Sequence, residues 1–197
     1  ELFDNAKAFS SQPIPNGRNV AILTNAGGPG IVATDACEKF GLVLAWLSYE
    51  TIDGLKALLP EQASIINPID VLGDATAERY ERALRLLLKD QGVDAVVVIL
   101  TPQAVTEPTE TAKVLVKVRS EYPDKPILAV FMGGDSIHEA IDILKSNNIP
   151  VYEIPEDAIK TLKNMVDYAE SLRVWYREEP LEFERNINLV QRVIGRA

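Results

Sequence analysis

The stretch that decides the fold is Asn19-Val-Ala-Ile-Leu-Thr-Asn-Ala-Gly-Gly-Pro-Gly30. Val20–Thr24 reads as a strand, because its apolar run is typical of a strand buried on both faces of a parallel sheet. The glycines lead into residues with helical spacing, and we predict a helix from Ile31 to Phe40. A buried strand, a glycine loop and a helix in this order indicate one unit of an alternating α/β fold.

Apolar runs and helical spacing alternate along the rest of the chain. We predict further strands over residues 42–47, 93–100, 127–131 and 151–152, and helices over 50–59, 107–120, 136–147 and 155–173, with one more helix carrying Tyr80, Leu84, Leu87 and Leu88. Residues 64–75 are predicted to be irregular. Strands alternating with helices predict an α/β fold with a doubly wound, parallel, five-stranded sheet. The expected strand order is the flavodoxin-like 2-1-3-4-5, because a full dinucleotide fold would need a sixth strand.

Changes in the pattern divide the chain into three segments. Residues 1–18 are expected to hold a short lead-in helix at 2–9 and a linker, and residues 19–173 the flavodoxin-like domain. Residues 174–197 are expected to form a linker and an amphipathic helix at 181–196, which Pro180 separates from the domain. Because the chain starts with Glu1 rather than methionine, we expect it to be a segment of a longer protein.

Composition and charge narrow the classes of partner. Of the 197 residues, 47% are hydrophobic and 25% are charged, which is enough apolar material for a substantial core. The net charge of −9 argues against binding to nucleic acid or to anionic membranes. The single cysteine, Cys37, excludes an internal disulfide and a zinc site built on thiolates. No apolar run reaches the roughly 18 residues of a membrane span, and we expect a cytoplasmic protein.

Two loops are candidates for a binding site. In open α/β sheets ligands bind beyond the carboxyl ends of the strands, at the switch point, which selects residues 25–30 and 101–108. In the first loop, glycines leave backbone N–H groups open at a helix N-terminus, which favours phosphate or carboxylate. A tight turn that binds nothing would use the same glycines. In the second loop, Thr101, Gln103 and Thr106 either bind a ligand or belong to ordinary helix capping.

A third loop, Asn67-Pro-Ile-Asp-Val-Leu-Gly-Asp74, is predicted to lie beside the same crevice. Its apolar residues indicate that it packs onto the domain, and the residues alone favour a structural role over a functional one. The single histidine, His138, is expected to be a surface residue rather than a catalytic one.

At these loops the sequence resembles the NDP-forming acyl-CoA synthetases, which include ADP-forming acetyl-CoA synthetase and are related to succinyl-CoA ligase. The matching stretches are 19–30, Asn67–Asp74, Met132-Gly-Gly-Asp135 and Asn148-Ile-Pro-Val-Tyr-Glu-Ile-Pro155. The resemblance covers about residues 1–173 and points to the second flavodoxin-like module of the α part.

The resemblance implies a ligase that makes acyl-CoA from a carboxylic acid, CoA and ATP. In that family ATP phosphorylates a histidine, the phosphoryl group passes to the acid, and CoA attacks the acyl phosphate. This module would supply a helix N-terminus and loops that bind the phosphoryl group and the acid. The residues implied are Asn25, Ala26, Gly27, Gly28, Gly30, Asn67, Asp70, Gly73, Thr101 and Gln103.

The resemblance also implies partners. The phosphorylated histidine and the CoA-binding module are expected upstream, and an ATP-grasp module downstream or on a separate subunit of an oligomeric enzyme. Residues 181–197 resemble the helical lead-in to the ATP-grasp module in fused members, so 174–197 are expected to lead toward that following module. The parent enzyme would use ATP or ADP, Mg²⁺ and CoA. This chain is expected to contain no catalytic residue and no metal site, and to be inactive alone.

Two other functional classes remain open for this chain. Residues 28–33 fit the G-x-G-x-x-A spacing of an NAD(P)-binding oxidoreductase domain, with Glu50 near the distance of a ribose ligand, although Glu50 reads as the start of a helix. A non-catalytic flavodoxin-like interaction module is the second alternative. A phosphorylated receiver domain is disfavoured, because Asn25 and Thr101 occupy positions where it needs acidic residues.

Overall fold

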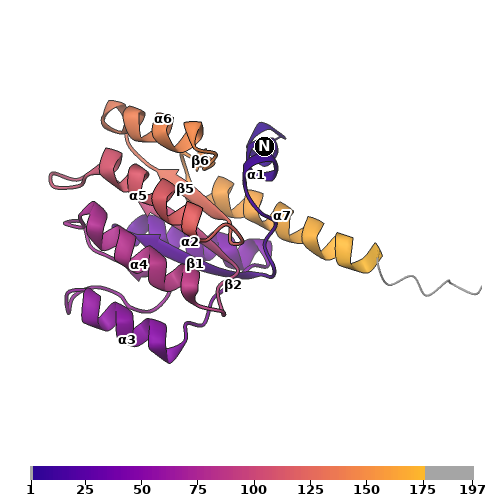
Figure 1. The fold of residues 1–197 in the computed structure, drawn as a ribbon, viewed down its shortest axis with the longest axis horizontal. Helices are drawn as coiled ribbons and strands as arrows, with labels where there is room; N and C mark the ends of the chain where they lie inside the picture. Colours follow the sequence, from indigo (N-terminus) through magenta and orange to yellow (C-terminus); the bar gives the residue numbers. More distant parts are fainter. Residues whose placement is uncertain (1, 176–197) are drawn as a thin grey trace, which may run out of the picture.

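The structure, a computed structural model, describes residues 2–175, without the side chain of Trp175. It confirms the α/β class: a parallel sheet lies between two layers of helices (Figure 1). The strands are β1 (Asn19–Thr24), β2 (Val43–Leu44), β3 (Ile69–Asp70), β4 (Ala95–Leu100), β5 (Ile127–Phe131) and β6 (Val151–Tyr152). The helices are α1 (Leu2–Ser11), α2 (Gly27–Phe40), α3 (Tyr49–Leu58), α4 (Ala77–Lys89), α5 (Pro108–Glu121), the 3₁₀ turn η1 (Asp135–Ile137), α6 (His138–Ser146) and α7 (Pro155–Trp175).

The strand order β2-β1-β4-β5-β6 is the predicted 2-1-3-4-5 with one strand added. The added strand, β3, lies in the segment predicted to be irregular. β2 pairs with β1 only at Asn19 and Val20, and β3 pairs further along the same edge, at Leu23 and Thr24. All these pairings are parallel. The sequence prediction was wrong here, because Ile69 and Asp70 lie between prolines, glycines and polar residues that are typical of a loop.

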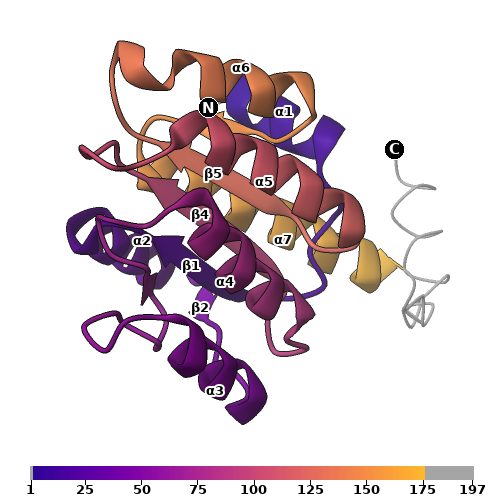
Figure 2. The ribbon, with the colours of Figure 1, turned by 60° about the vertical axis from the view of Figure 1, so that its left-hand side comes forward.

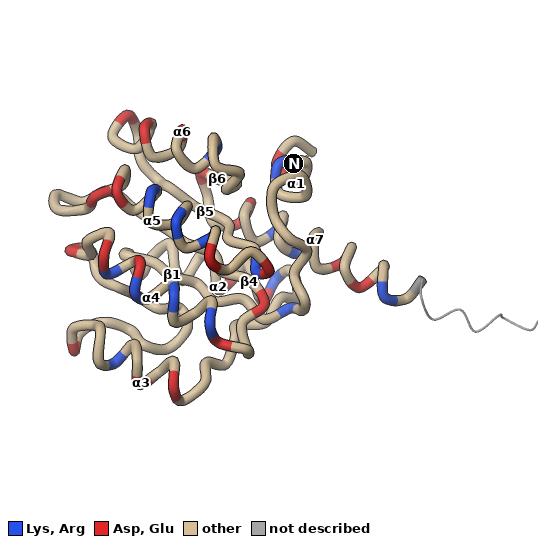
Figure 3. The backbone as a smooth tube through the Cα atoms, in the orientation of Figure 1, with Lys and Arg blue, Asp and Glu red and all other residues tan. Residues whose placement is uncertain are grey.

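The two faces of the sheet are covered by different helices (Figure 2). Because successive side chains of a strand point to opposite faces, Ala21 and Leu23 pack in the core with α3, α4, α5 and α6, whereas Val20 and Ile22 pack with α2 and α7. Charged residues occur mainly on the surrounding helices and loops (Figure 3). Cys37 is buried in the α2–α7 layer, and this burial raises the pKa of its thiol to about 12.

The lead-in helix packs against the domain. Phe9 of α1 and Tyr168 of α7 form an edge-to-face pair with 5.5 Å between ring centroids. Just after α1, the side chain of Gln12 accepts a hydrogen bond from Ile127 N at 2.9 Å and donates one to Asn148 O at 2.6 Å. The expected division at residue 18 stays a prediction, and the helix expected at 181–196 lies outside the described residues. None of the helices within 2–175 is long and apolar enough to cross a membrane.

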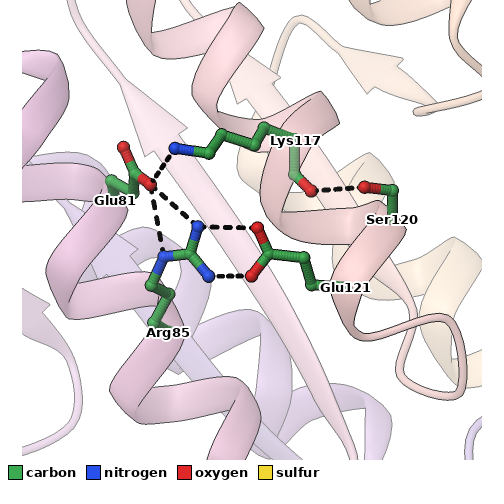
Figure 4. A network of polar contacts seen from close by, with 5 residues as sticks. All are labelled: Glu81, Arg85, Lys117, Ser120 and Glu121. Carbon is green, nitrogen blue, oxygen red and sulfur yellow. Dashed lines mark hydrogen bonds and ion pairs between the residues drawn. The ribbon is translucent and has the colours of Figure 1, made fainter.

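A network of charged side chains joins α4 to α5 on the outside of the domain (Figure 4). Glu81 accepts hydrogen bonds from Lys117 Nζ and from Arg85 Nη2, both at 2.8 Å, and Arg85 Nη2 also bonds Glu121 Oε1 at 2.8 Å. The bond from Lys117 and then the bond from Arg85 lower the pKa of the Glu81 carboxyl. A network of this kind stabilises a fold more than an isolated surface pair does.

We expect Glu81→Gln to lower the free energy of unfolding at neutral pH by about 1 kcal/mol, because the variant loses its charge-assisted bonds to Lys117 and Arg85. Since the pKa of Glu81 is lower in the folded state, its contribution is present above the unfolded pKa and is lost as the pH falls through the folded one. Urea unfolding followed by circular dichroism at several pH values should show the difference shrinking below about pH 4.

The matched control is Glu78→Gln. Glu78 is also on α4, but its carboxylate is 79% exposed and lies 4.0 Å from Arg82, so its removal should change stability little. An equal loss for both variants, or a loss for Glu81→Gln that persists at roughly pH 3, would contradict this role of the network.

Candidate functional site

The carboxyl ends of β1 and β4 bring the two predicted loops together. These strands are paired in register, with Thr24 opposite Ile99, so Asn25 and Thr101 leave the sheet side by side. Asn25 is only 2% exposed. Its Oδ1 accepts a hydrogen bond from Thr101 N at 2.9 Å, and its Nδ2 donates one to Thr101 O at 2.8 Å. The side-chain amide therefore clamps one loop to the other, and its oxygen and its nitrogen are both hydrogen-bonded to Thr101.

The N-terminus of α2 opens at this edge of the sheet. The helix begins at Gly27, four residues before the predicted start, because the glycines form its first turn. Its N-cap, Ala26, supplies no side-chain acceptor, and its first turn holds no acidic residue. The first N–H groups of a helix have no acceptor within the helix, and Gly27 and Gly28 are both exposed. These donors and the helix dipole favour an anion.

The starts of α3 and α4 are capped. Ser48 Oγ accepts from Thr51 N at 3.2 Å at the start of α3, and Thr76 Oγ1 accepts from Arg79 N at 3.4 Å at the start of α4. The carboxylate of Glu107 accepts from Ala77 N at 3.0 Å and adds a negative charge to the start of α4. α5 and α6 begin without a side-chain cap, as α2 does, but each has an acidic residue in its first turn. Among the described α-helices, α2 alone has no acidic residue there.

The three glycines of the loop differ in what surrounds them. A Cβ at Gly30 would lie 3.1 Å from Thr24 Cγ2, so this glycine allows α2 to pack closely on β1. A Cβ at Gly28 would meet nothing within 4 Å, and packing therefore does not explain its identity. At Gly27 the nearest atom would be Asp70 Oδ2, at 3.6 Å. Gly30 is thus a packing residue, whereas Gly28 leaves the backbone open to solvent or ligand.

Asp70 lies beside the α2 N-terminus because β3 pairs with the end of β1, where Val71 N donates to Thr24 O at 2.8 Å. Asp70 Oδ1 accepts from Leu72 N at 2.8 Å and supports Leu72, whose φ of 70° lies in the left-handed region. The other carboxylate oxygen faces Gly27. A negative charge therefore borders the group of N–H donors.

Two residues that sequence reasoning did not assign to the site bond its surroundings: Arg79 bonds this loop, and Tyr80 bonds β4. Arg79 Nη1 donates to Val71 O at 2.9 Å and to Asp74 at 2.6 Å. Tyr80 is fully buried, and its hydroxyl donates to Ile99 O at 2.8 Å. Burial, and then the charge of Asp70, raises the pKa of Tyr80 well above its usual value. Helical spacing identified Tyr80 only as a core residue, because its polar contacts come from tertiary structure.

Gly73 and Gln103 meet at the rim of the crevice. A Cβ on Gly73 would lie 2.7 Å from Gln103 Cδ, so the loop after β3 touches the loop after β4. Thr101 is half-buried between them and Asn25, and Gln103 is exposed. This edge of the sheet therefore brings together the α2 N-terminus, the Asp70 carboxylate and the loop from Thr101 to Gln103.

Residues 20–172 match the Ligase-CoA domain family. The chain belongs to this family. It is 41% identical over 176 residues to the acetate–CoA ligase [ADP-forming] II subunit alpha of Pyrococcus furiosus, covering 87% of this chain and 38% of that subunit. It is 35% identical to the 4-hydroxybutyrate–CoA ligase [ADP-forming] of Nitrosopumilus maritimus, covering 91% of this chain and 25% of that protein.

A solved structure has the same fold as this Ligase-CoA domain. It is the acetyl-coenzyme A synthetase 1 of Ca. Korarchaeum cryptofilum in complex with phosphate and ADP, with 32% identity and a TM-score of 0.83 over 91% of this chain and 39% of that one. The resemblance inferred from the sequence is confirmed. This Ligase-CoA domain spans well under half the length of these relatives.

The family favours the synthetase interpretation over the NAD(P)-binding one. Glu50, the residue near the distance of a ribose ligand, lies in the first turn of α3 rather than at the end of a strand.

Asn67 and Asn25 have structural partners in the Ligase-CoA domain. Asn67 Oδ1 accepts from Ile22 N at 3.0 Å, and Asn67 Nδ2 donates to Val20 O at 2.7 Å. The side chain thus bonds the edge of β1 between β2 and β3, so we leave Asn67 out of the proposed ligands. We treat Asn25 as a positioning residue for the same reason. Among residues 2–175 no cluster of three His, Cys, Asp or Glu side chains is placed to hold a metal ion.

We expect Asn25→Ala to destabilise the Ligase-CoA domain by about 2 kcal/mol, because it removes the clamp and leaves Thr101 N and Thr101 O without their partner. Urea unfolding measures the loss, and the amide resonance of Thr101 should shift. Asn16→Ala is the control, since Asn16 is exposed and accepts a hydrogen bond from Arg173 through its main-chain oxygen, which the substitution keeps. Equal stability of the two variants would show that the clamp does not hold the loops.

Proposed function

We propose that this chain is the phosphoryl- and acid-binding module of an ADP-forming acyl-CoA synthetase. The observation that carries the proposal is the open, uncapped N-terminus of α2 at the switch point of the sheet. The relatives support the reaction class, since two are named as ADP-forming CoA ligases for different acids and a third was solved with phosphate and ADP. The complete enzyme would make acyl-CoA from a carboxylic acid, CoA and ATP through a phosphohistidine and an acyl phosphate.

The contribution of this module would be electrostatic rather than covalent. The N–H groups of Gly27 and Gly28 would donate to phosphoryl oxygens, and the dipole of α2 would stabilise the negative charge during transfer. Both are held in place before the ligand arrives, because Gly30 seats the helix on β1 and Asn25 fixes the neighbouring loop. The domain would thus hold the phosphoryl group in position while groups from other modules react.

The acid would bind beside the phosphoryl group, against Thr101 and Gln103. Thr101 is half-buried next to Asn25, and Gln103 extends the rim toward Gly73. The hydroxyl and the amide can both donate hydrogen bonds to a carboxylate. Relatives named for acetate and for 4-hydroxybutyrate indicate small acids as the substrate class.

The remaining chemistry is proposed to come from other modules. A histidine-bearing module would carry the phosphoryl group, because His138, the single histidine of this sequence, is an exposed side chain at the start of α6 rather than of α2. A CoA-binding module and an ATP-grasp module would bind CoA and Mg²⁺–ATP in an oligomeric, cytoplasmic enzyme. Incubation of this chain alone with ATP, CoA and acetate should yield no acyl-CoA, and turnover would overturn this division of labour.

Titration with inorganic phosphate tests the anion site directly. In ¹H–¹⁵N spectra we expect saturable shifts of the Gly27 and Gly28 amides. Ala77 serves as an internal control, because its N–H at the start of α4 is already bonded to the Glu107 carboxylate. Gly28→Ala has room for its methyl group and should keep the fold, while the methyl crowds the N–H donors and weakens binding roughly fivefold, or about 1 kcal/mol. Unchanged binding in Gly28→Ala would remove the site from the α2 N-terminus.

Asp70→Asn should bind phosphate more tightly than the native chain, since it removes a negative charge beside Gly27. A gain of about 1 kcal/mol, roughly fivefold, is expected for a charge pair at the protein surface. Asp53→Asn changes the net charge equally but lies on α3, away from the crevice, and should have little effect. Equal gains in both variants would mean that phosphate responds only to net charge.

A further inference from the structure

Two hollows in the outer surface meet along α4, which lies beside α3 (Figure 2). The first has a volume of about 520 Å³ and is bordered by Trp46, and the second has a volume of about 370 Å³ and is bordered by Arg82. Leu86 and Lys89 line both hollows, which therefore form one groove, called here the α4 groove. Each hollow alone has the volume of a small-molecule site.

One end of the α4 groove presents an aromatic ring on a fixed backbone. Trp46 is 91% exposed, although tryptophan carries a large apolar surface. The main chain around it is held in place. Ser48 N donates to Asp90 Oδ2 at 2.8 Å, and a Cβ at Gly92 would lie 2.9 Å from Trp46 O, so this glycine permits a close approach of the two segments. The exposed indole is therefore positioned for a ring to stack on it.

The end of the groove beside Trp46 is rich in acceptors. Its lining includes the exposed carboxylate of Glu50 and the buried carboxylate of Asp90, which accepts from Gly92 N at 2.8 Å. α4 ends here at Lys89, and the last carbonyl groups of a helix carry partial negative charge. This end therefore favours the amino groups of a ligand over its phosphates.

The other end of the groove is cationic. Arg82, Arg85 and Lys89 line it, with no carboxylate among the described lining residues. The network of Figure 4 already offsets the charge of Arg85. Arg82 Nη1 lies 4.0 Å from the nearest carboxylate oxygen of Glu78, and Lys89 is exposed. In a chain with a net charge of −9, a group of cations around one hollow is a local attraction for anions.

The order of these features along the groove matches one class of small molecule. An aromatic ring with acceptors is followed by the apolar Leu86 and then by cations, and Arg82 and Lys89 are about 10 Å apart along α4. A purine nucleotide has the same order of an amino-bearing ring, a sugar and phosphates. The hollow on the other side of Trp46, beside β2, has no charged residue in its described lining and so lacks a phosphate end.

We propose that the α4 groove binds a purine nucleoside diphosphate group, with the base on Trp46 and the phosphates at Lys89 and Arg82. Free nucleotides and CoA both contain such a group. Gly92 precedes β4, so the groove lies toward the amino ends of the strands, whereas the α2 N-terminus lies at their carboxyl ends. The two sites are separate, and either proposal can fail without the other.

Titration of the full chain with ADP tests the groove. In ¹H–¹⁵N spectra we expect saturable shifts of the Trp46 indole N–H and of the Lys89 and Gln91 amides, and Gly28→Ala should leave these shifts unchanged. Trp46→Ala removes the stacking surface and should weaken ADP binding at these residues roughly tenfold. Trp46→Phe keeps a ring and should retain most of the affinity. Because Trp46 is exposed, both variants should keep the fold, which circular dichroism checks.

The phosphate end has a charge-matched control. Arg82→Gln with Lys89→Gln should weaken ADP binding roughly tenfold, because two cations at the groove are lost. Lys39→Gln with Lys145→Gln changes the net charge equally, but these lysines lie on α2 and α6, so this variant should bind ADP as the native chain does. Equal losses in the two double variants would show that ADP responds only to net charge and would overturn the proposal.

Pyrophosphate, GDP and CoA separate the parts of the ligand. Pyrophosphate lacks the ring, and if it binds the groove as tightly as ADP, or if Trp46→Ala binds ADP as tightly as the native chain, the nucleotide site is refuted. An absence of saturable shifts at Trp46, Lys89 and Gln91 refutes it as well. With the expected losses in the variants, tighter binding of ADP or GDP than of CoA assigns the groove to free nucleotides, and tighter binding of CoA assigns it to the nucleotide part of CoA.

Discussion

The hydrogen-bonding requirement of β1 organises this domain. Its residues from Val20 to Thr24 are buried, so each backbone N–H and C=O of the strand needs a partner. On one edge β4 supplies these partners along the strand. On the other edge β2, the side chain of Asn67 and β3 supply them in turn. The pairing of β3 with β1 places Asp70 beside the α2 N-terminus. Completing the hydrogen bonds of β1 therefore also positions a carboxylate next to the proposed anion site.

The site combines a rigid support with open backbone donors. Asn25, Gly30 and Arg79 are each used to hold an element in place. The N–H groups at Gly27 and Gly28 are the exception. A missing helix cap costs about 1 kcal/mol of stability, which α3 and α4 avoid with Ser48 and Thr76. α2 lacks that stabilisation at a helix N-terminus where the switch-point rule expects a ligand.

The sequence predicted the features that arise from local pattern. The apolar runs located β1, β4 and β5, and the bounds of β5 and β6 agree with the structure. Loops 25–30 and 101–108 were expected to meet, and Asn25 and Thr101 do so.

Features that depend on distant partners could not be predicted. Asn67 bonds Ile22, 45 positions away, and Asn25 bonds Thr101, 76 positions away, so neither role has a signature in neighbouring residues. The early start of α2 was missed because glycines have low helix propensity, which packing on β1 overrides.

The continuous length of α7 has a mechanical consequence. Its 21 residues form a rod about 31 Å long, buried on α2 along much of its length and tied near its end to Arg18 and Asn16. These contacts join α7 to the chain just before β1, and Arg18 also donates to Gly41 O just after α2. One helix and one arginine thus hold together the entry to β1 and the C-terminal end of α2, the helix whose N-terminus is the proposed anion site.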